Sequence, residues 1–116
     1  MQFLCLIYGT EGKDPQPGTE AFGAYIQEYE AFTAMCVENG VFKGGEALQP
    51  VATASTVTTE NGKVEIMDGP FAETKEQLGG YYLLDCKDLD EALSYAAKIP
   101  TAKYGRVEVR PIMTFE

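Results

Sequence analysis

Asp68 is the residue of this sequence that is best placed to act as a general acid or base. Asp68 follows an apolar, alternating stretch and opens a Gly69-Pro70 turn, with Phe71 next. An apolar neighbour such as Phe71, either a core residue or a pocket wall, would raise the pKa of the carboxyl toward that of a general base. Alternatively, Asp68 holds the turn, because Asp before Gly-Pro commonly accepts backbone hydrogen bonds. Asp68 is the best single catalytic candidate, and both interpretations stay open.

The other candidate ligand-binding residues are aromatic, basic or glycine. Lys75 either flanks a solvated turn or binds an acidic ligand. Tyr8 and Tyr82 would place hydroxyl groups in a cavity or pack with the hydroxyl at its rim. Arg110 either pairs with Glu108 on the same strand face or lies at a dimer seam or pocket mouth. The full candidate set is Tyr8, Gly45, Asp68, Gly69, Pro70, Phe71, Lys75, Tyr82 and Arg110.

The chain contains no histidine, which narrows the chemistry it could perform. Ser-His and Cys-His nucleophile arrangements are excluded, and the commonest transition-metal ligand is missing. No CxxC pair, GxGxxG motif or phosphate-binding loop occurs. We therefore expect no metal and no cofactor, and any acid–base chemistry would use Asp, Glu, Lys or Tyr.

The three cysteines favour a reducing compartment. The chain has an odd number of cysteines, and they are widely spaced. Each lies in an apolar segment: Cys5, Cys36 and Cys86. This pattern is typical of reduced thiols buried in the core of a cytosolic protein. A reactive thiol is the alternative, although there is no histidine to activate it.

Length and composition predict one globular domain over residues 1–116. Apolar residues make up 45% of the chain and charged residues 23%. There is no signal-peptide pattern, and no apolar run approaches the ~20 residues of a membrane span. The net charge of −9 disfavours binding to nucleic acid and to anionic lipid. We expect a cytoplasmic protein with neither nucleic acid nor membrane as a partner.

Two helices are predicted from apolar periodicity and capping residues. The first covers 19–39 with Thr19 as its N-cap. The second opens at Asp88, is supported by a capping-box pattern with Glu91, and is ended by Pro100. Helical spacing places on the inner face of the first helix Phe22, Tyr25, Ile26, Tyr29, Phe32 and Cys36.

The remaining apolar stretches are typical of strands. Asn61-Gly62 predicts a type I′ hairpin turn, and Gly44-Gly45 indicates a bulge or a close backbone approach within a strand. The predicted strands are 2–8, 41–48, 80–86 and 106–115, with a hairpin over 55–67. The loops are 9–18 and 68–79, the latter with a helical turn considered for 72–78.

This order, β-α-β-(ββ)-β-α-β, predicts an α+β protein: a ferredoxin-like split βαβ fold with an inserted β-hairpin. Two helices can cover only one face of the four-stranded sheet. The other face would carry apolar residues such as Leu4, Leu6 and Tyr8 into water. A second copy covering that face is the simplest solution, so we expect a homodimer.

Residues 68–82, DGPFAETKEQLGGYY, resemble the DGPF branch of the YCII-related family. Residues 1–9, 44–50, 99–100 and 107–111 resemble its other segments. The resemblance implies a dimeric α+β barrel but no settled activity. Members of the wider group carry a His and an Asp in a pocket, and this chain has no His. DGPF proteins are often encoded beside extracytoplasmic-function sigma factors, which implies a regulatory protein partner.

Three functions remain open at this stage. The first is a small-molecule-binding or regulatory protein, acting with such a sigma factor. The second, by analogy with other dimeric α+β barrels, is a cofactor-independent enzyme of isomerase or monooxygenase type acting on a small organic substrate. The third is a structural interaction module without a ligand.

Overall fold

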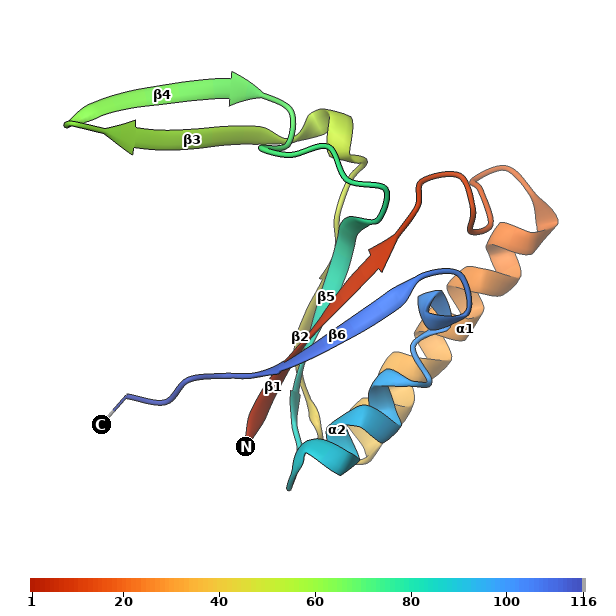
Figure 1. The fold of residues 1–116 in the computed structure, drawn as a ribbon. Coiled ribbons are helices and arrows are strands. Elements are labelled where there is room, and N and C mark those ends of the chain that lie inside the picture. The colour runs from red at the N-terminus through yellow and green to blue at the C-terminus, as the bar shows by residue number, and fades with distance from the viewer. Residues whose placement is uncertain (116) are drawn as a thin grey trace.

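The computed structural model describes residues 1–115 of the chain and confirms the predicted α+β fold (Figure 1). The four-stranded sheet has the order β2-β5-β1-β6, and all its neighbours are antiparallel. The strands are β1 (Gln2–Gly9), β2 (Phe42–Ala47), β3 (Ser55–Glu60), β4 (Lys63–Asp68), β5 (Gln77–Asp85) and β6 (Arg106–Pro111). The helices are α1 (Glu20–Glu38) and α2 (Leu89–Ala96), with short 3-10 helices η1 (Val51–Thr53) and η2 (Pro100–Lys103).

Both helices cover the same face of the sheet, and the core lies between them and the strands (Figure 1). Alternate residues of β1 point toward the helices and are almost fully buried. Burying such side chains stabilises the fold by about 1.5–3 kcal/mol each. The core consists of Phe3, Cys5, Ile7, Phe32, Cys36, Val41, Tyr82, Leu84, Cys86, Ala92, Ala96 and Ile99.

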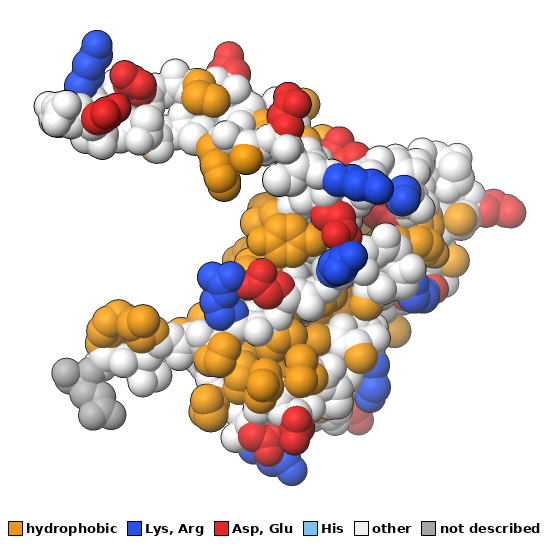
Figure 2. Space-filling view, viewed as in Figure 1, with side chains coloured by type: hydrophobic (Ala, Val, Ile, Leu, Met, Phe, Trp, Pro, Cys, Tyr) orange, Lys and Arg blue, Asp and Glu red, His pale blue; other side chains and the backbone are white. Residues whose placement is uncertain are grey.

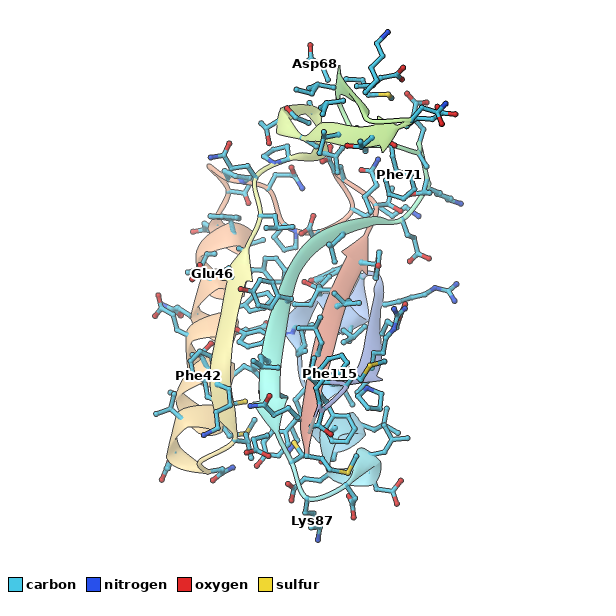
Figure 3. The ribbon with its side chains drawn as sticks, turned by 90° about the vertical axis from the view of Figure 1, so that its left-hand side faces the viewer. Phe42, Glu46, Asp68, Phe71, Lys87 and Phe115 are labelled. Atoms are coloured by element: carbon cyan, nitrogen blue, oxygen red, sulfur yellow. The ribbon has the colours of Figure 1, made fainter. Side chains whose placement is uncertain are left out.

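The opposite sheet face carries no helix and is called the open face here (Figure 3). Its centre is apolar, because Leu4 pairs with Leu83, and Leu6 pairs with Tyr81. These side chains are half-buried in the single chain. The expectation that one sheet face presents apolar residues outward is confirmed.

Capping residues fix where the helices begin. Thr19 Oγ1 accepts a hydrogen bond from Phe22 N at 3.2 Å, and Asp88 Oδ1 accepts one from Glu91 N at 2.9 Å. Both predicted N-caps are thus confirmed. The Glu91 carboxylate reaches back one residue further than in a capping box, accepting from Lys87 N at 3.1 Å.

Three predicted boundaries differ from the structure. The helix α2 ends at Ala96, before Pro100, which instead opens η2. The helical turn considered for 72–78 is wrong, because β5 already begins at Gln77. The early start is made possible by a bulge in the β1–β5 ladder, which absorbs Gly79 between paired residues. At the other end of the chain β6 stops at Pro111, and residues 112–115 lie outside the strand. Ile112 N still donates to Gln2 O at 2.8 Å, but Gln2 is the first residue of β1, so that strand extends no further for β6 to pair with.

The hairpin β3–β4 stands apart from the main sheet. Its turn has positive φ at both central residues, 51° at Asn61 and 78° at Gly62, as a type I′ turn requires. The hairpin extends from the same side of the molecule as the open face, and the chain segment that includes Phe115 extends from that side too (Figures 1 and 3). Neither described helix is both long and apolar enough to span a membrane.

Candidate functional site

A cavity of about 660 Å³ lies between α1 and the β2–β5 edge of the sheet. Residues of the 9–18 loop and of η2 complete its wall. The loop is tied to η1, because the Glu11 carboxylate accepts a hydrogen bond from Val51 N at 2.9 Å. The aromatic residues that line the cavity are Phe22, Tyr25, Tyr29, Phe42, Tyr81, Tyr82 and Tyr104.

Thr101 is the centre of a hydroxyl cluster at this cavity. The hydroxyl of Tyr25 is hydrogen-bonded to Thr101 Oγ1, and the hydroxyl of Tyr29 lies 2.5 Å from the same atom. Thr101 is buried because it sits in η2, whose turn packs under α1. The cluster therefore joins two segments that are more than seventy residues apart in sequence.

A second hydroxyl pair lies on the sheet side of the cavity. Tyr82 OH and Thr33 Oγ1 are 2.8 Å apart. The Tyr82 ring packs directly on the backbone of Gly45, where a Cβ atom would lie 2.8 Å from the ring and 2.9 Å from the carbonyl oxygen of Tyr81. Only glycine fits there, so the close approach expected at Gly44-Gly45 is confirmed. The ladder also shifts register between Phe42 and Gly44.

The cavity tyrosines are held in their neutral form. Burial raises the pKa of Tyr25 and Tyr29, an effect that their hydrogen bonds to Thr101 partly offset and the charge of Asp14 reinforces. Burial also raises the pKa of Tyr82, and the hydrogen bond between Tyr82 and Thr33 partly offsets that rise. These hydroxyls are protonated at neutral pH and can both donate and accept hydrogen bonds.

The charged residues of the lining are all acidic. They are Glu11, Asp14 and Glu46, and the residues that line the cavity include no Lys or Arg. In a partly enclosed site this excess of negative charge repels anions and attracts cations.

The Asp68–Phe71 segment lies away from this cavity, at the base of the hairpin (Figure 3). Its turn is held by backbone and threonine contacts, since Gly69 N donates to Ala54 O at 2.7 Å and Thr56 Oγ1 donates to Gly69 O at 2.8 Å. The Asp68 side chain is exposed, and Phe71 is 84% exposed. Pro70 is half-buried.

The remaining candidates are also spread out. Tyr8 lies on the open face, in a shallow recess with Glu76 and Arg106. Arg110 forms an ion pair with Glu108 on that face, as one interpretation predicted. The Lys75 side chain is exposed. Within one chain the structure therefore brings together only Gly45 and Tyr82, while the other seven candidates lie on the hairpin, its loop and the open face.

Sequence reasoning misses most of the cavity wall. The apolar periodicity correctly places Tyr25 and Tyr29 on one helix face, but it conceals their hydroxyl groups. Thr33 and Thr101 carry no signal, because threonine is common on surfaces and in turns. Only the presence of two tyrosines, Tyr25 and Tyr29, on one helix face could have indicated a polar cavity.

The three cysteines are unpaired and buried, as expected. Burial raises the pKa of Cys5 and of Cys36 to about 11, so both are protonated thiols at neutral pH. Burial also raises the pKa of Cys86. Residues 1–115 contain no group of three His, Cys, Asp or Glu side chains arranged to hold a metal ion.

Fold and cavity together define a ferredoxin-like α+β domain with a ligand-sized hollow on its helical side. The YCII-related domain matches residues 1–116, and the chain belongs to that family. It is 36% identical to an uncharacterised protein of Rhizobium meliloti (strain 1021), over 118 aligned positions that cover 100% of this chain and 95% of the relative. A structural comparison finds 5-chloro-2-hydroxyhydroquinone dehydrochlorinase of Burkholderia phenoliruptrix AC1100, solved with 2,5-dihydroxybenzoquinone. That match has 17% identity and a TM-score of 0.47, and it covers 97% of this chain and 94% of that one.

Proposed function

We propose that the protein binds a small organic molecule in the cavity beneath α1. The observation that carries the proposal is the cavity itself. Its volume of about 660 Å³ falls within the roughly 300–1,000 Å³ of ligand sites, and its aromatic wall holds a few convergent hydroxyl groups. Aromatic walls supply contact area, and placed hydroxyls fix the orientation of a ligand.

The proposal is tested by mapping small aromatic compounds on the ¹⁵N-labelled protein by NMR. We expect amide shifts concentrated in α1, β2, β5 and η2. Ala47→Phe should abolish binding, because Ala47 is an exposed residue of the cavity wall and a ring there would fill the opening. Ala52→Phe is the matched control, at an exposed residue of η1 outside the lining. Shifts scattered over the surface, or unaltered binding by Ala47→Phe, would contradict the proposal.

We also propose that the working form is a homodimer in which a second copy covers the open face. A compact chain of this length has a radius of gyration of about 13 Å, whereas this chain has 16.2 Å. The excess reflects the hairpin and the C-terminal segment, which extend on either side of the open face (Figure 1). Figure 2 shows hydrophobic side chains on both extensions and in the hollow between them. On the hairpin, the exposed apolar residues are Val57, Val64, Ile66 and Met67.

A second copy would also give the Asp68–Phe71 segment a role. In the single chain Phe71 is exposed, at the base of an arm that extends from the open-face side. We propose that Asp68, Gly69, Pro70 and Phe71 contribute to the dimer seam together with Tyr8 and Arg110 from the open face, where the seam would form a second small hollow near Lys75. Asp68→Asn tests for acid–base chemistry there, since unchanged activity on any substrate that is found would remove Asp68 from the mechanism.

We also propose a protein partner and a cellular location. The resemblance to DGPF proteins supports a sigma factor of the extracytoplasmic-function type as the partner, and the net charge of −9 would complement a basic surface. Three buried free thiols support a cytoplasmic location. Co-purification with a sigma factor encoded nearby tests the partnership. If the two proteins did not co-purify at low salt, that result would count against the partnership.

A further inference from the structure

We propose that the cavity beneath α1 selects small organic amines in their protonated form, in preference to neutral or anionic molecules of the same shape. The inference rests on the proposed binding function and adds the ligand's chemical class. Three independent features support it: the charge of the lining, the hydrogen-bonding capacity of the hydroxyl cluster, and the aromatic wall.

The lining offers a cation a carboxylate and offers an anion no positively charged side chain. Asp14 is half-buried in the cavity wall, and its charge reaches the hydroxyls of Tyr25 and Tyr29, whose pKa values, raised mainly by burial, it raises further. Lys103 is a basic neighbour of the Tyr104 ring, at 5.9 Å from its centroid, but it does not line the cavity. It is paired with Glu28 at 2.6 Å, so its charge is compensated outside.

The hydroxyl cluster has more acceptors to spare than donors. Each hydroxyl carries one proton and about two lone pairs. The two hydrogen bonds that join Tyr25 and Tyr29 to Thr101 use two protons and two lone pairs, and therefore leave about one proton and four lone pairs among the three groups. An ammonium group, which has three N–H donors and no acceptor, complements this surplus, whereas a carboxylate has acceptors alone.

The aromatic wall also suits a cation. Tyr25 meets Tyr29 edge-to-face with centroids 5.4 Å apart, and meets Tyr104 in the same way at 5.7 Å. Each ring has two negatively polarised faces, and an edge-to-face partner covers only one of them. A cation within about 6 Å of such a face is attracted by it.

The test uses three probes that share a phenol ring: tyramine, 4-ethylphenol and 3-(4-hydroxyphenyl)propionate, which are cationic, neutral and anionic at pH 7. Dissociation constants come from NMR titration of the full chain at low salt. We expect tyramine to bind about fivefold more tightly than 4-ethylphenol and about twentyfold more tightly than the propionate, as a partly exposed charge pair would give. Equal or tighter binding of the propionate or of 4-ethylphenol would overturn the inference and leave the proposed function standing. Binding by none of the three would overturn both.

Asp14→Asn separates the charge from the shape of the site. The amide can still accept the 3.2 Å hydrogen bond from Gln16 Nε2, so the loop should keep its conformation. We expect tyramine to lose most of its advantage while the affinity for 4-ethylphenol stays the same. Asp90→Asn, at an exposed acidic residue of α2, is the control and should alter neither affinity. An unchanged tyramine preference in Asp14→Asn would overturn the role of Asp14.

Discussion

At Gly45 the lack of a side chain decides how the cavity wall is built. An alanine Cβ would lie within 3 Å of both the Tyr82 ring and the Tyr81 carbonyl oxygen, and the carbonyl belongs to the sheet and cannot move away. We expect Gly45→Ala to lower the free energy of unfolding by about 1–3 kcal/mol, the usual cost of overpacking. Urea denaturation followed by circular dichroism measures the change.

Gly23 is the natural comparison, because it lies within α1 and an added Cβ there would meet no atom within 4 Å. Gly23→Ala should raise stability by up to about 1 kcal/mol through helix propensity. If Gly45→Ala were as stable as the unmodified protein, the close packing of Tyr82 on β2 would be incorrect.

Buried thiols should make the fold sensitive to alkali. Burial raises the pKa of Cys5 and Cys36 from 9.0 in the unfolded chain to about 11 in the fold. The stability they contribute as neutral groups is fully present below pH 9 and is lost as pH rises toward 11, because the unfolded state then binds fewer protons. The loss is on the order of 1 kcal/mol per thiol for each pH unit in that window.

Urea denaturation at pH 8 and pH 10.5 measures this loss. Cys36→Ala should be less stable at both pH values but should show a shallower decline between them, since one titrating group is gone. The same decline in both proteins would show that Cys36 is not the group responsible.

At the scale of single elements, α2 depends on its N-terminal cap. The helix is short, and Asp88 satisfies the N–H of Glu91 at 2.9 Å while adding negative charge at the positive end of the helix. Asp88→Ala should cost about 1 kcal/mol of the free energy of unfolding. Asp90→Ala keeps the cap and should lower the free energy of unfolding by only about a few tenths of a kcal/mol. If the two variants lost equal stability, the negative charge of Asp88 and not its capping hydrogen bond would explain its effect.

The elements that sequence predicts well are those with local signals. Thr19, Asp88 and Asn61-Gly62 each satisfy or bend the backbone within a few residues, so their spacing carries the information. The predicted start of β5 is too late because Gly79 resembles a break in the pattern, whereas the ladder to β1 bulges at that residue and continues to Gln77. That ladder is a long-range pairing, and local propensity does not record it.

The cavity lies largely beyond sequence reasoning for the same reason. Tyr29 and Thr101 are in contact only because η2 folds under α1. The sequence pattern of neither segment predicts this contact. Sequence alone can identify Tyr82 and Gly45 as candidate site residues, because an aromatic residue and a paired glycine within strands are easily recognised. The Asp68–Phe71 segment is conspicuous as a motif, although in one chain it lies at the base of the hairpin.

At the scale of the whole molecule, the open face should govern assembly. We expect the unmodified protein to have twice the mass of one chain by light scattering. Leu6→Arg should yield a folded monomer, because burying its charge at the seam costs more in desolvation than a contact with the neighbouring Glu108, already paired with Arg110, would return. Val37→Arg is the matched control, at an exposed apolar residue of α1 on the opposite side of the sheet, and should remain a dimer. A monomeric unmodified protein, or a dimeric Leu6→Arg variant, would refute the proposed seam.

The burial of all three native thiols has a practical consequence for watching the hairpin. A Glu60→Cys substitution would put a solvent-facing sulfur beside the β3–β4 turn, and a maleimide dye would find it without any native cysteine having to be removed. With donor and acceptor dyes on separate subunits, energy transfer would then report in real time whether the two arms lie near or far from each other as the complex forms.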